Sequence, residues 1–153
     1  MKTIELHRSI TDSNDRDAGR LRSELTEKGV FLINVMSAAG SGKTTLLLQL
    51  IADLKGCLSV GVMEADIASD IDAVEVEKAG AKSIQAHTDG MCHMDAGMTA
   101  VAVSELEKET LPDLIFLENV GNLICPAEYD TGAHRNIMLL SVPEGDDKDR
   151  KST

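Results

Sequence analysis

A glycine-bearing loop between a buried strand and an amphipathic helix constrains the fold of this chain more than any other feature. Residues 37–44 read Ser-Ala-Ala-Gly-Ser-Gly-Lys-Thr. They follow an apolar run, Val30–Met36, which only Asn34 interrupts and which predicts a buried strand. They lead into Lys43–Lys55, whose apolar residues recur at helical spacing. A strand, a glycine loop and a helix in this order are the setting of a phosphate-binding loop, or P-loop.

The residue types in this loop suit phosphate binding. Its glycines let backbone N–H groups converge on phosphate oxygens, and the helix N-terminus adds a partial positive charge. Lys43 is expected to reach the β- and γ-phosphates, and Thr44 to place its hydroxyl on Mg²⁺. The alternative is a tight strand–helix turn with a chance lysine, which the flanking strand and helix disfavour. We therefore expect a nucleotide to bind at Ala39, Gly40, Ser41, Gly42, Lys43, Thr44 and Thr45.

Strands and helices alternate along the rest of the sequence. Apolar runs predict further strands at 59–65, 82–86, 113–120 and 136–142. Periodic segments predict further helices at 16–28, at 71–79 and from Cys92 or His93 to Glu109. This alternation predicts an α/β fold, with a mostly parallel sheet and helices on both of its faces.

Two acids are placed where a P-loop protein orders its magnesium. Asp66 follows the predicted strand 59–65, and Glu118 lies near the end of the predicted strand 113–120. Both are expected at the carboxyl ends of strands, where open α/β sheets bind ligands. We therefore expect Lys43, Asp66 and Glu118 to serve catalysis, and Thr44, Asp66 and Glu118 to surround Mg²⁺.

The composition excludes several classes of function. Aromatic residues make up 2% of the chain and the formal net charge is −11, which disfavours nucleic-acid binding by base stacking or by coating a duplex. No apolar run reaches the ~18–20 residues of a membrane span, and the polar N-terminus does not resemble a secretory signal. Three cysteines without the spacing of a disulfide framework fit a reducing, cytoplasmic compartment.

Two of the cysteines are candidate metal ligands. Cys92 and His93 are adjacent at the expected start of a helix, where the pKa of a thiol falls. Cys125 follows a later strand, and in a parallel sheet both loops can open on the same edge. One chain then supplies at most three ligands, whereas Zn²⁺ and Ni²⁺ commonly take four, so a dimer would complete the site. The equally weighted alternative is that Cys92 and Cys125 are buried free cysteines. Cys57 is expected in the core, and His134 is expected on the surface.

Five stretches of the sequence together form a recognisable pattern. They are the phosphate loop 36–47, then Glu64–Ala73, Gly90–Ala96 around Cys92, Glu118–Asp130 and Ser141–Lys148. They resemble the corresponding segments of the hydrogenase nickel-incorporation GTPases, the HypB family, which often has serine at the position of Ser37. The resemblance runs from about residue 15 to residue 148, nearly the whole chain.

This resemblance implies a P-loop GTPase of the SIMIBI class that forms a homodimer on binding GTP or metal. It implies Ni²⁺ or Zn²⁺ binding through Cys92, His93 and Cys125, with slow GTP hydrolysis gating transfer of the metal. It also implies two partners, a small HypA-like nickel chaperone and the large subunit of a nickel–iron hydrogenase. In the family, the positions of Asp66 and Glu118 serve magnesium and its waters.

The chain departs from the family pattern at several positions. Ala65, Met91 and His87 stand where the family commonly has glycine, glycine and asparagine. The guanine-reading Asn-Lys-x-Asp motif is absent from the sequence, so the choice of GTP over ATP rests on the resemblance alone. We accordingly expect three parts: an N-terminal helical extension at 1–29, a P-loop GTPase domain incomplete at its C-terminus at 30–148, and a polar tail at 149–153.

Other functions fit the same residues. One is a metal-binding and dimerisation module without GTPase activity, which the missing base-reading motif favours. Another is a nickel GTPase chaperone for a different client, such as urease. A metabolic P-loop kinase ranks lower, because no acceptor-binding or lid segment is visible in the sequence.

Overall fold

The computed structural model describes residues 2–38, 42–65, 73–86, 88 and 90–140, with the backbone alone described for residues 2–11. Five parallel strands form one sheet in the order β3-β2-β4-β1-β5. The strands are β1 (Phe31–Ser37), β2 (Val60–Glu64), β3 (Lys82–Gln85), β4 (Leu114–Glu118) and β5 (Arg135–Leu139). The helices are α1 (Lys2–Glu27), α2 (Lys43–Leu54), α3 (Ala73–Ala79), α4 (Ala96–Glu107) and α5 (Cys125–Glu128).

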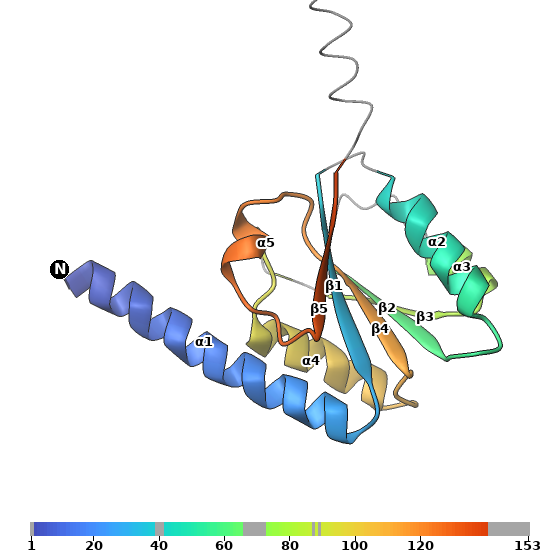
Figure 1. Cartoon of the computed structure of the whole chain (residues 1–153), viewed down its shortest axis with the longest axis horizontal. Coiled ribbons are helices and arrows are strands. Elements are labelled where there is room, and N and C mark those ends of the chain that lie inside the picture. Colours follow the sequence, from blue (N-terminus) through green and yellow to red (C-terminus); the bar gives the residue numbers. More distant parts are fainter. Residues whose placement is uncertain (1, 39–41, 66–72, 87, 89, 141–153) are drawn as a thin grey trace, which may run out of the picture.

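Helices cover both faces of the sheet, as predicted (Figure 1). On one face α2 and α3 pack in a cluster that includes Leu47, Ile51, Val62, Val76 and Phe116. On the other face α1 and α4 pack in a cluster that includes Leu25, Leu32, Leu106, Ile115 and Leu117. Side chains alternate between the two faces along each strand. The predicted α/β class is therefore confirmed.

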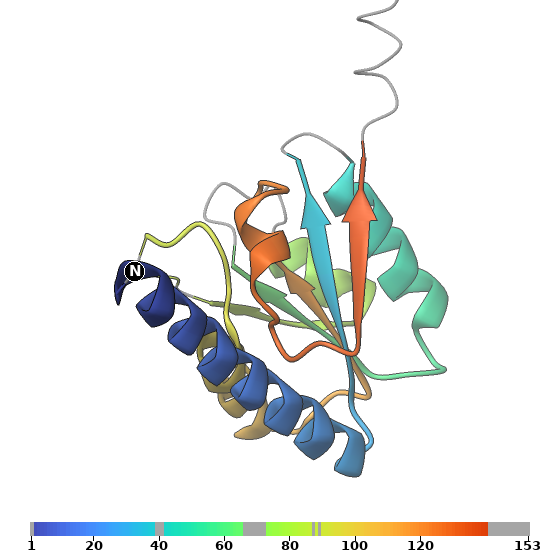
Figure 2. The ribbon, with the colours of Figure 1, turned by 60° about the vertical axis from the view of Figure 1, so that its left-hand side comes forward.

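The carboxyl ends of the strands meet at one edge of the sheet. Figure 2 shows β1 and β5 pointing to the same edge, beside the start of α2. The register places Val35 of β1 opposite Glu118 of β4, and Glu64 of β2 opposite Glu118 from the other side. The segments expected to bind phosphate and magnesium thus converge on this edge.

Helix α1 is longer than the sequence predicted, because it begins at Lys2 rather than at Arg16. The segment before Arg16 carries only scattered apolar residues, so periodicity could not predict it. Leu21 and Leu25 lie in the core cluster that α1 shares with α4. The division of the chain at residue 29 stays a prediction, but the second half of α1 packs as part of the fold.

Helix α4 begins at Ala96, so the prediction that Cys92 or His93 opens this helix is wrong. Asp95 is the N-cap residue: its carboxylate accepts a hydrogen bond from the Met98 N–H at 2.9 Å. This bond satisfies a backbone donor that has no partner within the first turn of the helix. Cys92 and His93 therefore lie in the connection between β3 and α4.

None of the helices in the described ranges is long and apolar enough to cross a membrane.

Candidate functional site

The start of α2 has the geometry of an anion-binding helix terminus. Gly42 precedes the helix with a φ of 85°, a left-handed conformation that favours glycine. No side chain of the described residues caps this end, and the Leu46 N–H donates to the Gly42 carbonyl at 3.1 Å. The backbone N–H groups of Lys43, Thr44 and Thr45 precede that bond and suit a phosphate. Three further predicted nucleotide-binding residues lie outside the described ranges: Ala39, Gly40 and Ser41.

Lys43 reaches the end of β4. Its Nζ atom lies 2.9 Å from Oε1 of Glu118, and the Glu118 side chain is 0% exposed. A buried carboxylate of this kind needs a cation or hydrogen-bond donors, because burial alone strongly disfavours its charge. The structure thus brings together two of the three predicted catalytic residues. The third, Asp66, lies outside the described residues.

The donor set at this edge fits a nucleotide with Mg²⁺. Hydroxyl and carboxylate oxygens are the ligands that Mg²⁺ prefers, and Thr44 and Glu118 carry them. The Ser37 hydroxyl, at the end of β1, is buried and has no hydrogen-bond partner among the described residues. A buried hydroxyl without a protein partner in this position fits a bound phosphate, whose oxygens accept hydrogen bonds.

Glu64 is a carboxylate that the sequence analysis missed. It ends β2, is 6% exposed, and accepts a hydrogen bond from the Ser83 hydroxyl at 3.1 Å. Its Cα is the register partner of Glu118. The signal that identified Glu118, an acid at the end of an apolar strand, applies equally to Glu64. Two buried carboxylates therefore lie next to each other at this edge of the sheet.

The two candidate cysteine ligands, Cys92 and Cys125, are neighbours in space. A hydrogen bond between their side chains, together with burial and the charge of Cys92, raises the pKa of the Cys125 thiol. The sequence placed Cys92 at the start of a helix, but α4 begins only at Ala96. The structure therefore places the two sulfur atoms as one pair, but not in the setting that the sequence predicted.

His93 adjoins this pair without forming a finished metal site. Its Nδ1 atom lies 3.9 Å from the Cys92 sulfur, and its ring stacks on Tyr129 with centroids 4.0 Å apart. No group of three or more His, Cys, Asp or Glu side chains within the described ranges is arranged to hold a metal. The ligand set Cys92, His93 and Cys125 therefore stays a prediction. The third cysteine, Cys57, is exposed rather than in the core.

Two asparagines to which the sequence analysis assigned no role also contact this region. Asn119 and Asn122 follow β4, and their side chains bond the backbone of both cysteine-bearing segments. Polar residues placed directly after a buried strand were the signal that could have found them. Their bonds to Met94 and Cys92 join segments far apart in the sequence, so no local pattern predicts those two bonds.

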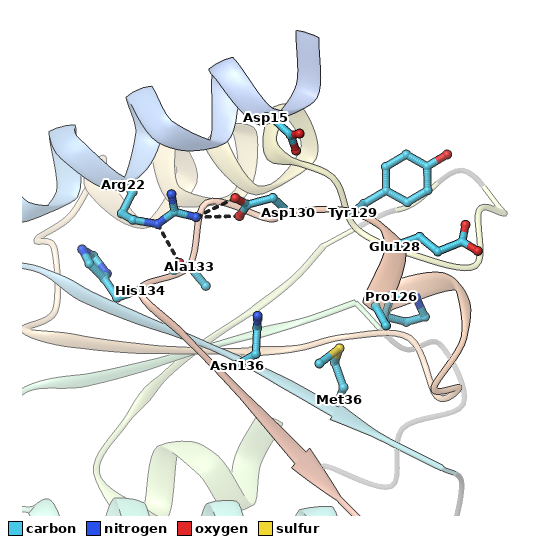
Figure 3. A pocket seen from close by; sticks show the side chains of 11 residues that line it. Asp15, Arg22, Met36, Pro126, Glu128, Tyr129, Asp130, Ala133, His134 and Asn136 are labelled. Carbon is cyan, nitrogen blue, oxygen red and sulfur yellow. Dashed lines mark hydrogen bonds and ion pairs between the residues drawn. The ribbon is translucent and has the colours of Figure 1, made fainter. Parts of the chain in front are cut away.

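A polar cavity of about 450 Å³ adjoins the segment that carries Cys125. Figure 3 shows Arg22 of α1 reaching across it to Asp130 and Ala133. Arg22 donates to both Asp130 carboxylate oxygens, at 2.6 and 2.8 Å, and to the Ala133 carbonyl at 2.9 Å. Asn14 adds a second tie, because it donates to the Asp130 carbonyl and accepts from the Ala96 N–H, each at 2.9 Å. Helix α1 thus anchors the segment after α5.

A phosphate-binding loop at the carboxyl edge of a parallel sheet, with a pair of cysteines nearby, matches one class of protein. The chain belongs to the CobW/HypB/UreG nucleotide-binding domain family, which matches residues 31–140. Within this family, the relatives described below are HypB proteins, so the resemblance to HypB is confirmed.

Curated relatives come from bacteria and archaea. The chain is 45% identical over 152 residues to the hydrogenase/urease maturation factor HypB of Helicobacter hepaticus, covering 96% of this chain and 61% of the relative. It is 40% identical over 144 residues to the probable hydrogenase maturation factor HypB of Methanocaldococcus jannaschii, covering 94% and 65%. The chain thus spans less than two thirds of the length of these relatives.

Solved structures agree with this assignment. The crystal structure of HypB from Archaeoglobus fulgidus superposes with a TM-score of 0.77 at 38% identity, over 92% of this chain and 68% of that one. The structure of HypB from Helicobacter pylori in complex with nickel gives a TM-score of 0.76 at 41% identity, over 91% and 65%.

Proposed function

We propose that this chain acts as a GTP-dependent metallochaperone, which binds nickel or zinc and assists nickel insertion during maturation of a nickel–iron hydrogenase. The observation that carries the proposal is that both candidate sites contact the end of β4. There Glu118 pairs with Lys43 at 2.9 Å, and the next residue, Asn119, accepts a hydrogen bond from the Met94 N–H at 3.2 Å. A lysine expected to bind phosphate and the segment expected to carry metal ligands therefore both contact a single strand end, which supports the proposal.

On the nucleotide side, Lys43 exchanges Glu118 for the β- and γ-phosphates. Its positive charge and the N–H groups at the start of α2 stabilise the charge that builds on the phosphate oxygens in the transition state. Thr44, Asp66 and Glu118 hold Mg²⁺ and its waters. Water would attack the γ-phosphorus of bound GTP as the phosphoanhydride bond breaks, which would release inorganic phosphate and leave GDP. The Gly42 turn and the buried Ser37 hydroxyl support this assignment.

On the metal side, nickel is cargo rather than a resident cofactor. Cys92 and Cys125 supply sulfur donors, and His93 serves as a third ligand or as a hydrogen-bond partner of Cys92. Thiolate and imidazole donors suit Ni²⁺ and Zn²⁺. A second protomer completes the coordination, which makes the metal-bound form a homodimer. The nickel complex of H. pylori HypB supports nickel as the metal.

The cellular setting follows from the family. A HypA-like chaperone receives or supplies nickel, and the hydrogenase large subunit is the final acceptor. The names of the Helicobacter relatives also mention urease, so a urease client is an alternative for the same machinery. We propose that the protein works in the cytoplasm, and neither a nucleic acid nor a membrane takes part.

The experiment that tests the proposal is a pair of titrations on the purified chain. Fluorescent GTP and ATP analogues are titrated in the presence of Mg²⁺, with unlabelled nucleotides as competitors, and Ni²⁺ is titrated separately. Selective GTP binding together with nickel binding supports the proposal. Nickel binding without any nucleotide binding would instead establish a metal-binding and dimerisation module.

A further inference from the structure

Two asparagines in the loop after β4 bracket the candidate metal ligands. We propose that Asn119 and Asn122 form a clamp that positions Cys92, His93 and Cys125 for metal binding. Neither side chain is a metal donor in this proposal, so both are positioning residues. The inference rests on the proposed function, because it concerns the geometry of the same metal site.

Asn122 connects the two cysteine-bearing segments with one side chain. Its Nδ2 atom donates to the Cys92 carbonyl at 2.9 Å. Its Oδ1 atom accepts from the Cys125 N–H at 2.9 Å and from the Ile124 N–H at 3.2 Å. A primary amide donates and accepts at the same time, which a carboxylate or a hydroxyl in one rotamer cannot reproduce in full. The side chain therefore sets the distance between the backbones that carry the two thiols.

Asn119 holds the other side of His93. It is 0% exposed, and its Oδ1 atom accepts from the Met94 N–H at 3.2 Å and from the Val120 N–H at 2.8 Å. Asn122 bonds the backbone just before His93, and Asn119 bonds the backbone just after it. The clamp therefore fixes the short segment that presents Cys92 and His93 from both sides.

The clamp is anchored in the sheet by a row of amides. Asn119 Nδ2 donates to Asn34 Oδ1 at 3.0 Å, and Asn34 Nδ2 donates to Asn136 Oδ1 at 3.1 Å. This row crosses from β4 over β1 to β5. Buried amide groups are costly to leave without hydrogen bonds, so the row keeps Asn119 in a single orientation. The rotamer that bonds Met94 is thus set by the sheet rather than by the loop that follows β4.

Residues that orient ligands from outside the coordination sphere typically contribute 10- to 100-fold in metal affinity. The test uses Asn122, which is half-buried, because a change there spares the core. Asn122→Ala removes all three hydrogen bonds and is expected to weaken nickel binding by about 10- to 100-fold. Asn122→Asp keeps the acceptor oxygens for Ile124 and Cys125 but loses the donor to Cys92, so an intermediate loss is expected.

Nickel affinity is measured by competition with a chromogenic chelator, and the thiolate-to-nickel charge-transfer absorption reports the coordination geometry. Gln49→Ala is the control, because it removes an amide hydrogen bond to Asp53 on α2 and touches neither the cysteine segments nor the amide row. It is expected to bind nickel like the unmodified chain, with the same spectrum. Nucleotide affinity, measured on each variant, is expected to stay unchanged.

The outcomes separate the clamp from the function on which it rests. If Asn122→Ala keeps the affinity and spectrum of the unmodified chain while Cys92→Ala loses nickel, the clamp is wrong and the metal site stands. If Cys92→Ala and Cys125→Ala both bind nickel normally, the proposed metal site fails and the clamp fails with it. A parallel loss of nucleotide affinity in Asn122→Ala would assign Asn122 to the fold as a whole and overturn the proposal.

Discussion

His134 contributes hydrogen bonds to the fold that depend on its protonation state. Its Nδ1 atom accepts from the Leu32 N–H at 3.0 Å, which requires this nitrogen to carry no proton. Its Nε2 atom lies 2.9 Å from the Thr26 hydroxyl, and its ring stacks on Phe31. The sequence suggested a surface histidine, yet the residue is half-buried and joins the end of α1 to β1. Its role is therefore structural.

We expect His134 to make stability fall in mildly acidic solution. Burial lowers its pKa below the usual 6.5, and the neighbouring charges of Arg22 and Arg135 lower it further. Its contribution is therefore fully present above about pH 6.5 and is lost as the pH falls through the lowered value. His134→Asn retains an acceptor for the Leu32 N–H without a titrating group. Urea unfolding from about pH 8 to pH 5 should show a flatter stability profile for this variant. Identical profiles would contradict the prediction.

The Lys43–Glu118 pair allows structural and functional roles to be separated. Lys43→Ala removes the ammonium from beside a buried carboxylate, a change that typically costs about 3 kcal/mol or more. Glu118→Gln neutralises the carboxylate, so we expect the double variant Lys43→Ala/Glu118→Gln to recover much of this stability. Nucleotide binding should stay lost in the double variant, because the phosphates lack their cation. Urea unfolding and nucleotide titration measure the two effects separately. Recovery of nucleotide binding would remove Lys43 from the phosphate site.

At the level of elements, α1 holds the Cys125 segment through a two-pronged contact. The planar guanidinium of Arg22 bonds both Asp130 oxygens, and the Gly132 N–H donates to the same carboxylate at 2.9 Å. The two oxygens are bonded by Nη2, while Nε bonds the Ala133 carbonyl, and the single ammonium of lysine cannot hold both partners from two fixed donors. The pair is about one-third exposed, so solvent screening limits the loss in Arg22→Lys to about 1 kcal/mol.

The more specific effect of Arg22→Lys is expected in hydrogen exchange. Amides of residues 130–134 should exchange faster, while those of β1 and β4 should not. Arg20→Lys is the control, because Arg20 lies on the same helix and its contact to Asp17 is exposed and long, at 3.9 Å. Equal exchange in both variants would mean that α1 does not anchor this segment.

The sequence predicted those elements whose signal is local. The strands and α2 came from continuous or periodic apolar residues, and Gly42 marked the loop before α2. The start of α4 was placed at Cys92 or His93 because the N-cap preference of Asp95 was overlooked. A distant contact, the Ala96 N–H bonding Asn14, adds to the choice of Asp95. The strand order and the bonds from Asn119 to Met94 and from Asn122 to Cys92 join segments far apart in sequence, so no single stretch contains them.

For the whole molecule, charge opposes self-association. The formal net charge of −11 makes two copies repel each other, most strongly at low ionic strength. A divalent cation shared between the copies offsets this repulsion locally and supplies directional bonds. Association of the chain is therefore expected to depend on metal, with added salt lowering the metal concentration that is required.

The stoichiometry of metal binding tests this view of the assembly. The proposed site draws on Cys92, His93 and Cys125 of each protomer, and the described part of the chain contains no finished group of three metal donors. A metal that takes four ligands then draws two thiolates from each of two chains. Light scattering during nickel titration should show a monomer becoming a dimer with one metal shared between two chains. Cys92→Ala/Cys125→Ala should stay monomeric, whereas Cys57→Ala, which removes an exposed thiol, should still dimerise. A dimer that survives the double variant would place the interface elsewhere. Cys57, the one cysteine left in the sequence, cannot supply four thiolates to a metal shared by two chains.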